Sequence, residues 1–442
     1  MSEFLLNRVC RLAMRLTHSS RVLLLSTALG IAVRESGAQS SASIPAERVT
    51  LREVFDSVRA NNPMLGAANA HVRAARGGLF SARTWSNPVV SLESQQMEQA
   101  QGLPSQREVM TTAMLPLDPF YQRGPRILRA QALIRASQAD VLTQRQQVAL
   151  DAADTFYEVA LAQVNVSATR SLAQWFDTVV TYNSVRVREG VTAEADLIRS
   201  ELERDHVLNE LAIAESELAR AEADLQAFVG ARQEPAGVQV EVDSLPLDTS
   251  RTITTVMRPE VEAARQRVVA SEAAAAGEKR MFLRELGAMV GTKTMGGSSS
   301  LVTGFTVPFP LLDQNRGSIS AAHAERDAAK FDLELEQRRA DADLSGAEKA
   351  ARILSERVAA FGSGKVGYLA RAEEARRIAL GAYREGGTTL LQVIDAARAW
   401  REARDSYFET LFAQHRAVIR LLAARGIDVL DAWPGSRSGA KQ

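Results

Sequence analysis

Apolar residues recur every three to four positions over long segments of this chain, as they do along one face of an amphipathic helix. The longest such segment begins at Pro125 and ends at Arg188, and Leu142, Ala149 and Phe156 recur within it at intervals of seven. No further proline and no glycine interrupts it. Since an α-helix rises about 1.5 Å per residue, the segment predicts a helix about 95 Å long. Ordinary globular domains do not contain helices of this length.

Shorter helices are predicted on both sides of the long one. Thr50 and Glu53 have the spacing of a capping box, which predicts a helix over 51–83 that is interrupted at Asn62-Pro63. Gly190 ends the long helix because glycine accepts the left-handed backbone of a helix end. The next helix is predicted over 192–228.

The second half of the chain repeats these helix boundaries. Asn62-Pro63 returns as Arg258-Pro259, and Arg188-Glu189-Gly190 returns as Arg384-Glu385-Gly386 at the same separation. The pattern predicts a duplicated module with helices over 260–284, 319–385 and 388–425, in which Gly346 and Gly362 are tolerated weak points of the middle helix. The predicted boundaries are 49–230 for the first repeat, 231–257 for an equatorial linker and 258–426 for the second repeat.

Each module also contains two short segments with alternating apolar and polar residues, the period of a β-strand. They span 89–97 and 108–115 in the first module, and 286–294 and 301–309 in the second. Polar loops over 98–107 and 295–300 join them into two predicted β-hairpins. Ser91, Glu93 and Thr306 are expected on one face of the strands, and Phe305 and Phe309 on the opposite face. If the strands form a membrane barrel, the first face would line its lumen and the second would face lipid; the reverse assignment remains open.

The N-terminus resembles a secretory signal peptide, with several arginines before the apolar run 22–33 and small residues before a cleavage site after Ala38. A transmembrane anchor is the alternative, but a spanning helix needs roughly 20 apolar residues. Cys10, the only cysteine, lies within residues 1–38 and would leave with them. At the other end, residues 427–442 are expected to be a disordered tail.

Several classes of function are excluded by composition. The 53 basic and 53 acidic residues balance, so no basic footprint for nucleic acid exists. No nucleophile motif, phosphate loop or acid pair suggests an enzyme, so no catalytic or cofactor-binding residue is expected. The histidines are scattered without metal-ligand spacing, so no metal site is expected either; they are His71, His206, His323 and His415.

Four strands in one chain are too few to close a membrane barrel, whose smallest members have eight. Because open strand edges are not tolerated in lipid, several copies of the chain would have to pool their strands. A soluble coiled coil is the alternative, but it requires strict heptads and has no use for two strand pairs.

Three motifs, at 190–197, 307–317 and 383–388, resemble those of the TolC-like outer membrane efflux proteins, and the resemblance covers about 49–426. It implies a mainly α fold with membrane β-structure: a homotrimer with a twelve-stranded barrel in the outer membrane and a long α-helical tunnel through the periplasm. Such a protein is the passive exit duct of a tripartite pump, and works with a periplasmic adaptor and an inner-membrane pump of the RND type. The stretch Asp313–Gly317 favours the heavy-metal branch, of the cobalt-zinc-cadmium type. A periplasmic adaptor protein is the alternative function.

The same resemblance implies an entrance gate at the two helical turns. Asp196 and Tyr383 match a hydrogen-bonded pair of the family, but Thr388 replaces the arginine that completes it. Asp395 matches one position of an acidic ring, and Gln392 stands at the other. Asp196 could instead only stabilise its helix N-terminus, and Asp395 could be a solvated surface acid.

Contact with the adaptor is implied for the residues of the two turns themselves. These residues are Gly190, Val191, Gly386 and Gly387.

Overall fold

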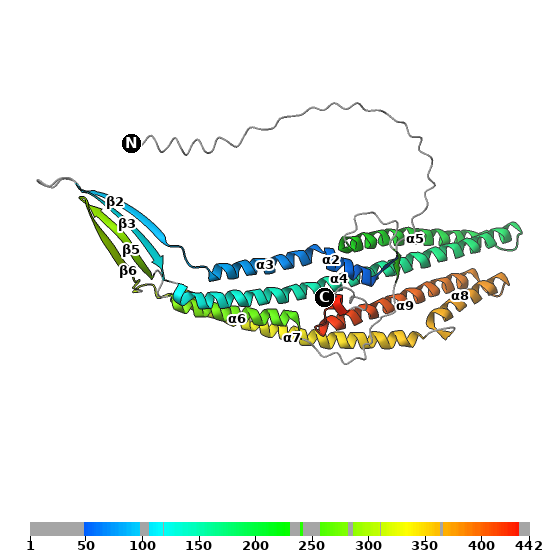
Figure 1. The fold of residues 1–442 in the computed structure, drawn as a ribbon. Helices are drawn as coiled ribbons and strands as arrows, with labels where there is room; N and C mark the ends of the chain where they lie inside the picture. The colour runs from blue at the N-terminus through cyan, green and yellow to red at the C-terminus, as the bar shows by residue number, and fades with distance from the viewer. Residues whose placement is uncertain are drawn as a thin grey trace, which may run out of the picture. The chain divides into compact units, whose positions relative to one another are not determined.

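The computed structural model describes residues 48–97, 106–117, 119–229, 239–241, 257–281, 286–309, 311–362 and 366–432 (Figure 1). All of them belong to one unit, Ala46–Gln442. The predicted signal peptide, most of the first polar loop, most of the linker and the end of the predicted tail lie outside the described residues. Among the described residues, no helix is both long enough and apolar enough to cross a membrane.

The N-terminal helices follow their predicted capping signals. α2 spans Leu51–Asn61, and the predicted capping box of Thr50 and Glu53 is formed at its start. α3 spans Pro63–Arg83, and the side chain of Asn62 accepts a hydrogen bond from the amide of Met64 at 2.9 Å. The proline occupies the first helical turn, where its missing N–H is not needed.

The long helix, α4, is confirmed and spans Pro119–Arg188, 70 residues or about 105 Å. α5 follows over Glu194–Val229. α4 packs against α3, α5, α6 and α9, so it is the element around which the other helices are arranged. Most of its predicted stripe is buried: Ala149, Ala152, Phe156 and Val159 are at most 1% exposed, but Leu142, at the start of the stripe, is 46% exposed.

The second module contains α6, Pro259–Arg280, and a helix that is broken where the sequence predicts continuity. α7 spans Arg316–Phe361, and α8 spans Tyr368–Arg384. The prediction of one helix over 319–385 is wrong because Gly362 adopts a φ of 69°, a left-handed backbone that ends the helix. Gly346, by contrast, lies inside α7. α9, Leu390–Ala424, completes the second hairpin.

The four predicted strands form one antiparallel sheet in the order β2-β3-β5-β6. Their bounds are β2 Val89–Met97, β3 Gln106–Pro116, β5 Gly287–Met295 and β6 Ser298–Thr306. The loop predicted over 295–300 is too long, because β5 and β6 are joined by Gly296 and Gly297 alone. Both have positive φ, 56° and 87°, as two-residue hairpin turns require. A short parallel pair, β1 Arg48–Thr50 with β4 Gln239–Glu241, lies apart from this sheet.

The two faces of the four-stranded sheet differ in chemistry. Alternation along each strand and the register between strands place Val90, Leu92, Val290, Leu301 and Phe305 on one face. Leu92 is 73% exposed and Phe305 is 79% exposed. The opposite face carries charged residues, and Lys293 pairs there with Glu108 at 2.6 Å. This matches the predicted alternation of Ser91 and Glu93 against Phe305, but β6 ends at Thr306, so Phe309 lies outside the sheet and the predicted strand 301–309 extends too far.

The main core lies where α2, α4, α5 and α9 meet, and the residues just after α9 contribute to it. Val429 and Leu430, in the short helix α10 (Val429–Ala432), are at most 1% exposed. Asp428 pairs with Arg145 of α4 at 2.8 Å. Residues 427–432 are therefore packed, and the prediction of a disordered tail is wrong for them. The signal that was missed is the apolar pair at 429–430, three residues after the helix-ending Gly426.

A second core, nearer the hairpin turns, joins α4, α5, α8 and α9. It contains Phe176, Val179, Val207, Tyr383, Val393 and Trp400, among others. α7 contributes almost nothing to either core: its buried residues are Ala322, Ala351 and Phe361.

Candidate functional site at the hairpin turns

The two turns that reverse the helical hairpins have the same backbone geometry. Gly190 ends α4 with a φ of 70°, and Gly386 follows α8 with a φ of 77°. The amide of Val191 donates to the carbonyl of Arg186 at 2.9 Å, and the amide of Gly387 donates to that of Ala382 at 2.8 Å. These are the closing bonds of a Schellman motif, in which carbonyls left free at a helix end gain donors. The duplication seen in the sequence therefore extends to single hydrogen bonds.

The residues predicted to contact an adaptor lie in these turns and are accessible. Gly190, Gly386 and Gly387 are exposed, and Val191 is 60% exposed. No atom lies within 4 Å of a Cβ built on Gly190 or Gly386, so their positive φ rather than crowding requires glycine there.

Gln392 has a local partner, Thr389, at a capping-box spacing that the gate prediction did not use. Its backbone amide donates to Thr389 Oγ1 at 3.5 Å, and Thr389 N donates to Gln392 Oε1 at 3.3 Å. The hydroxyl of Thr388 donates to the same Oε1. Gln392 and Thr388 therefore help to cap the N-terminus of α9, in a capping box equivalent to that of α2.

Tyr383 is buried and makes a different bond from the one expected. Its hydroxyl donates to Asn183 Oδ1 of α4 at 2.7 Å. A hydroxyl carries one proton, so the expected hydrogen bond to Asp196 is not formed within this chain. Asp196 lies in the first turn of α5, where its charge suits the helix N-terminus. Burial raises the pKa of Tyr383, and the nearby negative charge of Asp196 raises it further.

Neighbouring side chains extend this contact across the two hairpins. The Tyr182 hydroxyl donates to the Arg384 carbonyl at 3.0 Å. The rings of Tyr182 and Tyr383 meet edge to face with centroids 5.8 Å apart. The guanidinium of Arg186 lies 5.4 Å and 5.9 Å from these two ring centroids, within the range of cation–π attraction.

Asn183 was missed by the reasoning from sequence, although a signal for it exists. Phe176 and Val179 continue the buried stripe of α4, and Asn183 occupies the next inward position. Its side chain is fully buried. A single asparagine in an apolar helix seam fixes register and partner at a cost in stability. The partner, Tyr383, could not be identified from spacing because 200 residues separate the two.

α8 is also held by an arginine stacked among tryptophans. The Arg376 guanidinium lies 4.2 Å from the ring centroid of Trp400 on α9 and 5.8 Å from that of Trp175 on α4. Arg376 also pairs with Glu373 at 2.6 Å. One side chain of α8 thus contacts both helices beside it.

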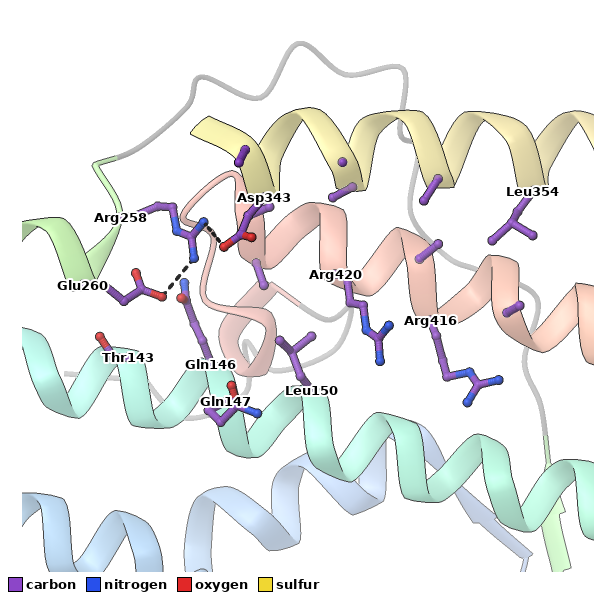
Figure 2. Close-up of a pocket in the computed structure, with 18 residues that line it drawn as sticks. Thr143, Gln146, Gln147, Leu150, Arg258, Glu260, Asp343, Leu354, Arg416 and Arg420 are labelled. Carbon is purple, nitrogen blue, oxygen red and sulfur yellow. Dashed lines mark hydrogen bonds and ion pairs between the residues drawn. The ribbon is translucent and has the colours of Figure 1, made fainter. Parts of the chain in front are cut away.

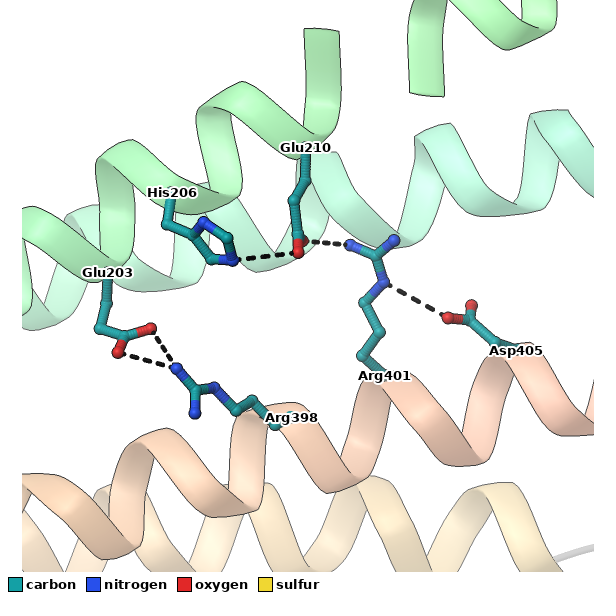
Figure 3. Close-up of polar contacts among 6 residues, drawn as sticks. All are labelled: Glu203, His206, Glu210, Arg398, Arg401 and Asp405. Atoms are coloured by element: carbon teal, nitrogen blue, oxygen red, sulfur yellow. Dashed lines mark hydrogen bonds and ion pairs between the residues drawn. The ribbon is translucent and has the colours of Figure 1, made fainter. Parts of the chain in front are cut away.

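An exposed row of ion pairs joins α5 to α9 (Figure 3). Arg398 contacts both oxygens of Glu203 at 2.9 Å, and Arg401 contacts Glu210 at 2.8 Å. His206 lies 3.2 Å from the same Glu210. We call these pairs the α5–α9 ion-pair row. Asp395, one turn before Arg398, is exposed and forms no ion pair with another described residue of the chain.

A cavity of about 760 Å³ lies between α4, α7, α9 and the start of α6 (Figure 2). Arg258 bridges Glu260 and Asp343 at its edge, both at 3.1 Å. Arg416 and Arg420 extend from α9 toward α4 across it. Alanine and glycine line much of the α7 side. No group of three or more possible metal ligands occurs among the described residues.

Comparison with known proteins shows which family this chain resembles. The sequence pattern described as outer membrane efflux protein matches residues 54–231. The cobalt-zinc-cadmium resistance protein CzcC of Cupriavidus metallidurans is 24% identical over 415 residues, which are 90% of this chain and 95% of CzcC. Over residues 54–231 the chain therefore matches the outer membrane efflux protein family.

Further relatives agree with this assignment. The nickel and cobalt resistance protein CnrC of Cupriavidus metallidurans is 27% identical over 309 residues, 65% of this chain and 71% of CnrC. Among solved structures, the outer membrane protein VceC of Vibrio cholerae matches with a TM-score of 0.71 and 18% identity, covering 85% of this chain and 96% of VceC. The predicted TolC-like fold and outer membrane location are confirmed. CzcC and CnrC are heavy-metal resistance proteins, and the outer membrane efflux family is a transport family, not a class of enzyme. The adaptor alternative finds no support.

Proposed function

We propose that this outer membrane efflux protein is the exit duct of a tripartite pump, built from three copies of the chain, and that its cargo is heavy-metal cations. The observation that carries the proposal is the four-stranded sheet with two free edges. β2 and β6 each have a neighbour on one side only. Free edges are not stable in lipid, so the sheets of neighbouring copies must join edge to edge into a closed wall.

The chemistry of the two sheet faces supports this arrangement. The apolar face is highly exposed in one chain, as a lipid-facing surface must be. The opposite face carries Glu93, Glu108 and Lys293, which suits a water-filled lumen. Of the two orientations left open by the sequence, this one keeps Glu93, Glu108 and Lys293 out of lipid, and Arg107, which shares the apolar face, lies at the loop end of β3.

The exposed helix α7 supports assembly from several copies. Phe331 is 71% exposed, and Ile353 is 60% exposed. In the first module the equivalent long helix, α4, is covered mainly by α3, α5, α6 and α9. Neighbouring copies would cover α7 in the same way and close the helical wall, and three copies make the homotrimer that the resemblance implies.

The turns are the proposed docking points for other pump components. The exposed glycines at 190, 386 and 387, with Val191, offer accessible backbone for a periplasmic adaptor. An inner-membrane pump, of the RND type, would supply the energy, since the duct has no catalysis of its own. We further propose that the mature chain begins after Ala38, and that the repeats span 49–230 and 258–426 around the linker 231–257.

The cargo proposal comes from the relatives, because CzcC and CnrC are named for resistance to cobalt, zinc, cadmium and nickel. The three Asp395 side chains of a trimer would lie near the axis and favour cations. We would delete the gene and measure survival and metal accumulation in zinc, cobalt, cadmium and nickel, with hydrophobic drugs as the comparison. Sensitivity to metals alone is expected. Sensitivity to drugs alone would overturn the metal assignment.

A further inference from the structure

We infer that one face of the four-stranded sheet binds soft monovalent metal cations, Cu(I) and Ag(I), through methionine sulfur atoms as the cations leave the duct. The inference rests on the proposed duct function and adds a class of cargo to it. CzcC and CnrC are named for other metals, which are cobalt, zinc, cadmium and nickel. The binding is a series of brief contacts with a passing cation, not the storage of a resident metal ion.

The methionines of the sheet gather on one of its two faces. Alternation along the strands places them on the face that carries Glu93, Glu108 and Lys293, which we call the charged face. The methionines with a described side chain on this face are Met110, Met114, Met289 and Met295. Among the described strand residues, none on the opposite face is a methionine.

This distribution is unusual for apolar side chains in a membrane sheet. In such a sheet the apolar residues face lipid, and the residues that face the lumen are polar. Leu92, Leu301 and Phe305 follow this rule, whereas the methionines do not. Leucine and methionine are close in volume and exchange readily in protein cores, so size does not explain why they occupy different faces. The sulfur atom, rather than apolarity, accounts for the position of the methionines.

Two of these methionines form a pair near the helical end of the sheet. Met114 of β3 and Met289 of β5 are direct partners in the register. A Cβ built on Gly287 would lie 3.5 Å from Met114 Sδ, and one built on Gly304 would lie 3.4 Å from Met289 Cε. Both side chains therefore lie along the sheet above glycines. Residues directly opposite in an antiparallel pair have Cβ atoms about 5 Å apart, so the two thioethers can share one cation.

The other two methionines lie nearer the hairpin ends, beside acidic residues. Met110 is flanked in the register by Glu93 of β2 and Lys293 of β5, and Met295 is opposite Glu108. Lys293 pairs with Glu108 at 2.6 Å, so these three charged residues leave one net negative charge on the charged face. Met295 is 40% exposed, and Met110 is partly exposed. A cation is attracted here by the carboxylate charge and meets accessible sulfur.

The methionines form steps along the strand direction. At about 3.4 Å per residue, Met110 lies about 14 Å from the level of Met114, and Met295, opposite Glu108, lies about 20 Å from it. In the proposed wall, every copy of the chain would contribute the same steps around the lumen. Conduction requires several sites that each bind weakly enough to release the ion. A row of thioethers meets this requirement.

The choice of cation follows from the chemistry of the donor atom. A thioether is a soft, uncharged ligand and favours soft cations such as Cu(I), whereas harder cations prefer nitrogen and oxygen ligands. Histidine, cysteine and carboxylate side chains form no cluster of three or more possible metal ligands in the part of the chain that the structure describes. The steps on the charged face should therefore distinguish silver from cobalt.

Oxidation footprinting tests the inference on the unaltered protein. Dilute hydrogen peroxide converts accessible methionine to its sulfoxide, and mass spectrometry locates each oxidised residue. With silver nitrate at about ten times its dissociation constant, in chloride-free buffer, oxidation of the four methionines of the charged face should slow about tenfold. Met64 of α3, which is 52% exposed, is the internal control and should oxidise at an unchanged rate. Equal protection of Met64, or no protection of the four, would overturn the inference.

Leucine substitutions separate the effect of sulfur from that of side-chain volume. A variant combines Met110→Leu, Met114→Leu, Met289→Leu and Met295→Leu, which keep apolar side chains of similar size. Titration calorimetry should show silver binding weakened by about tenfold or more, and cobalt binding unchanged. Met64→Leu is the matched control and should bind silver as the wild type does. Cys10→Ser is included in every preparation so that no thiol competes.

Two results of the calorimetry would contradict the inference. One is a wild-type affinity for silver in the leucine variant. The other is a loss of silver binding in Glu93→Gln with Glu108→Gln while the leucine variant still binds, because carboxylates would then be the ligands. Folding of the leucine variant is checked by its recovery from outer membranes, and the footprint of the wild type decides the question even if that variant does not fold.

Survival of cells separates this inference from the proposed function. Deletion of the gene should lower tolerance to silver, copper and cobalt. The leucine variant should restore tolerance to cobalt and not to silver. Full restoration of silver tolerance by this variant would overturn the inference and leave the duct function intact. A deletion that lowers tolerance to no metal would instead count against the proposed export of metals.

Discussion

The two helical hairpins of this chain have the same repeated helix boundaries, but their long arms differ in continuity and in burial. In the first, α4 runs uninterrupted for 70 residues and is covered mainly by α3, α5, α6 and α9. In the second, the corresponding arm is broken at Gly362, and α7 is largely exposed. The comparison teaches that the first hairpin is buried as a scaffold within one chain, whereas the second leaves most of α7 uncovered.

The largest difference in stability is expected between substitutions of two phenylalanines, one buried in α4 and one exposed on α7. Phe156→Ala in α4 removes a side chain that is 1% exposed, and should lower the free energy of unfolding by about 3–5 kcal/mol. Phe331→Ala in α7, at 71% exposure, should change it by less than ~0.5 kcal/mol in the separated chain. Denaturant unfolding of each variant checks this. Equal losses would remove the distinction between the two arms.

Acid should weaken the contact of α9 with the scaffold. His415 is 6% exposed, lies 5.4 Å from the Tyr157 ring of α4, and has its pKa lowered by burial to about 4. The unfolded chain, with an ordinary histidine pKa of about 6.5, binds the proton more readily. Stability is therefore full above about pH 6.5 and is lost as the pH falls toward about 4, by up to about 3 kcal/mol.

The measurement is the free energy of unfolding from neutral pH down to the lowered pKa of His415. His415→Leu should flatten this part of the profile, because the buried titrating group is gone. His71→Gln, which removes an exposed histidine of α3, is the control and should leave the profile unchanged. An unaltered slope in His415→Leu would show that another group carries the acid sensitivity.

Two glycines of the second arm should respond to alanine with opposite signs. Gly362→Ala places a side chain at a φ of 69° and should destabilise by about 1–2 kcal/mol. Gly346→Ala lies in the middle of α7 with nothing within 4 Å of the new Cβ, and should stabilise by about 1 kcal/mol. Thermal unfolding of both variants checks the signs. Stabilisation by both would mean that the break at Gly362 is not a fixed feature.

The smallest effect is expected at the α5–α9 ion-pair row. Glu203→Gln removes an exposed pair and should cost about 0.2–1 kcal/mol at low salt, and less at high salt because exposed charges are screened. Unfolding at two salt concentrations measures this. A loss that stays the same at both concentrations would indicate that the row is not held by screened charges.

Local signals in the sequence predicted much of this fold. The capping box at Thr50, the glycine stops at 190 and 386, and the alternation in 301–305 each depend on residues close together in the chain. Such signals determine where a helix or strand starts, where it ends, and which residues share one of its faces. The long α4 and the two strand pairs were predictable for the same reason.

The remaining features depend on contacts between distant segments. Glycine is tolerated inside helices and also ends them, so the sequence alone did not distinguish Gly346 from Gly362. The packing of Leu430 and the Tyr383–Asn183 bond join residues hundreds of positions apart. The gate residues suggested by the sequence do lie near the turns, but the partner of Tyr383 within the chain was not predicted.

Several copies of the chain are proposed to assemble because the sheet has unpaired edges and α7 is largely exposed in one chain. Native mass spectrometry of the mature protein, extracted gently from outer membranes, tests it most directly. We predict a single species with three times the mass of one mature chain. A species with the mass of one chain, under conditions that keep the sheet folded, would contradict the account.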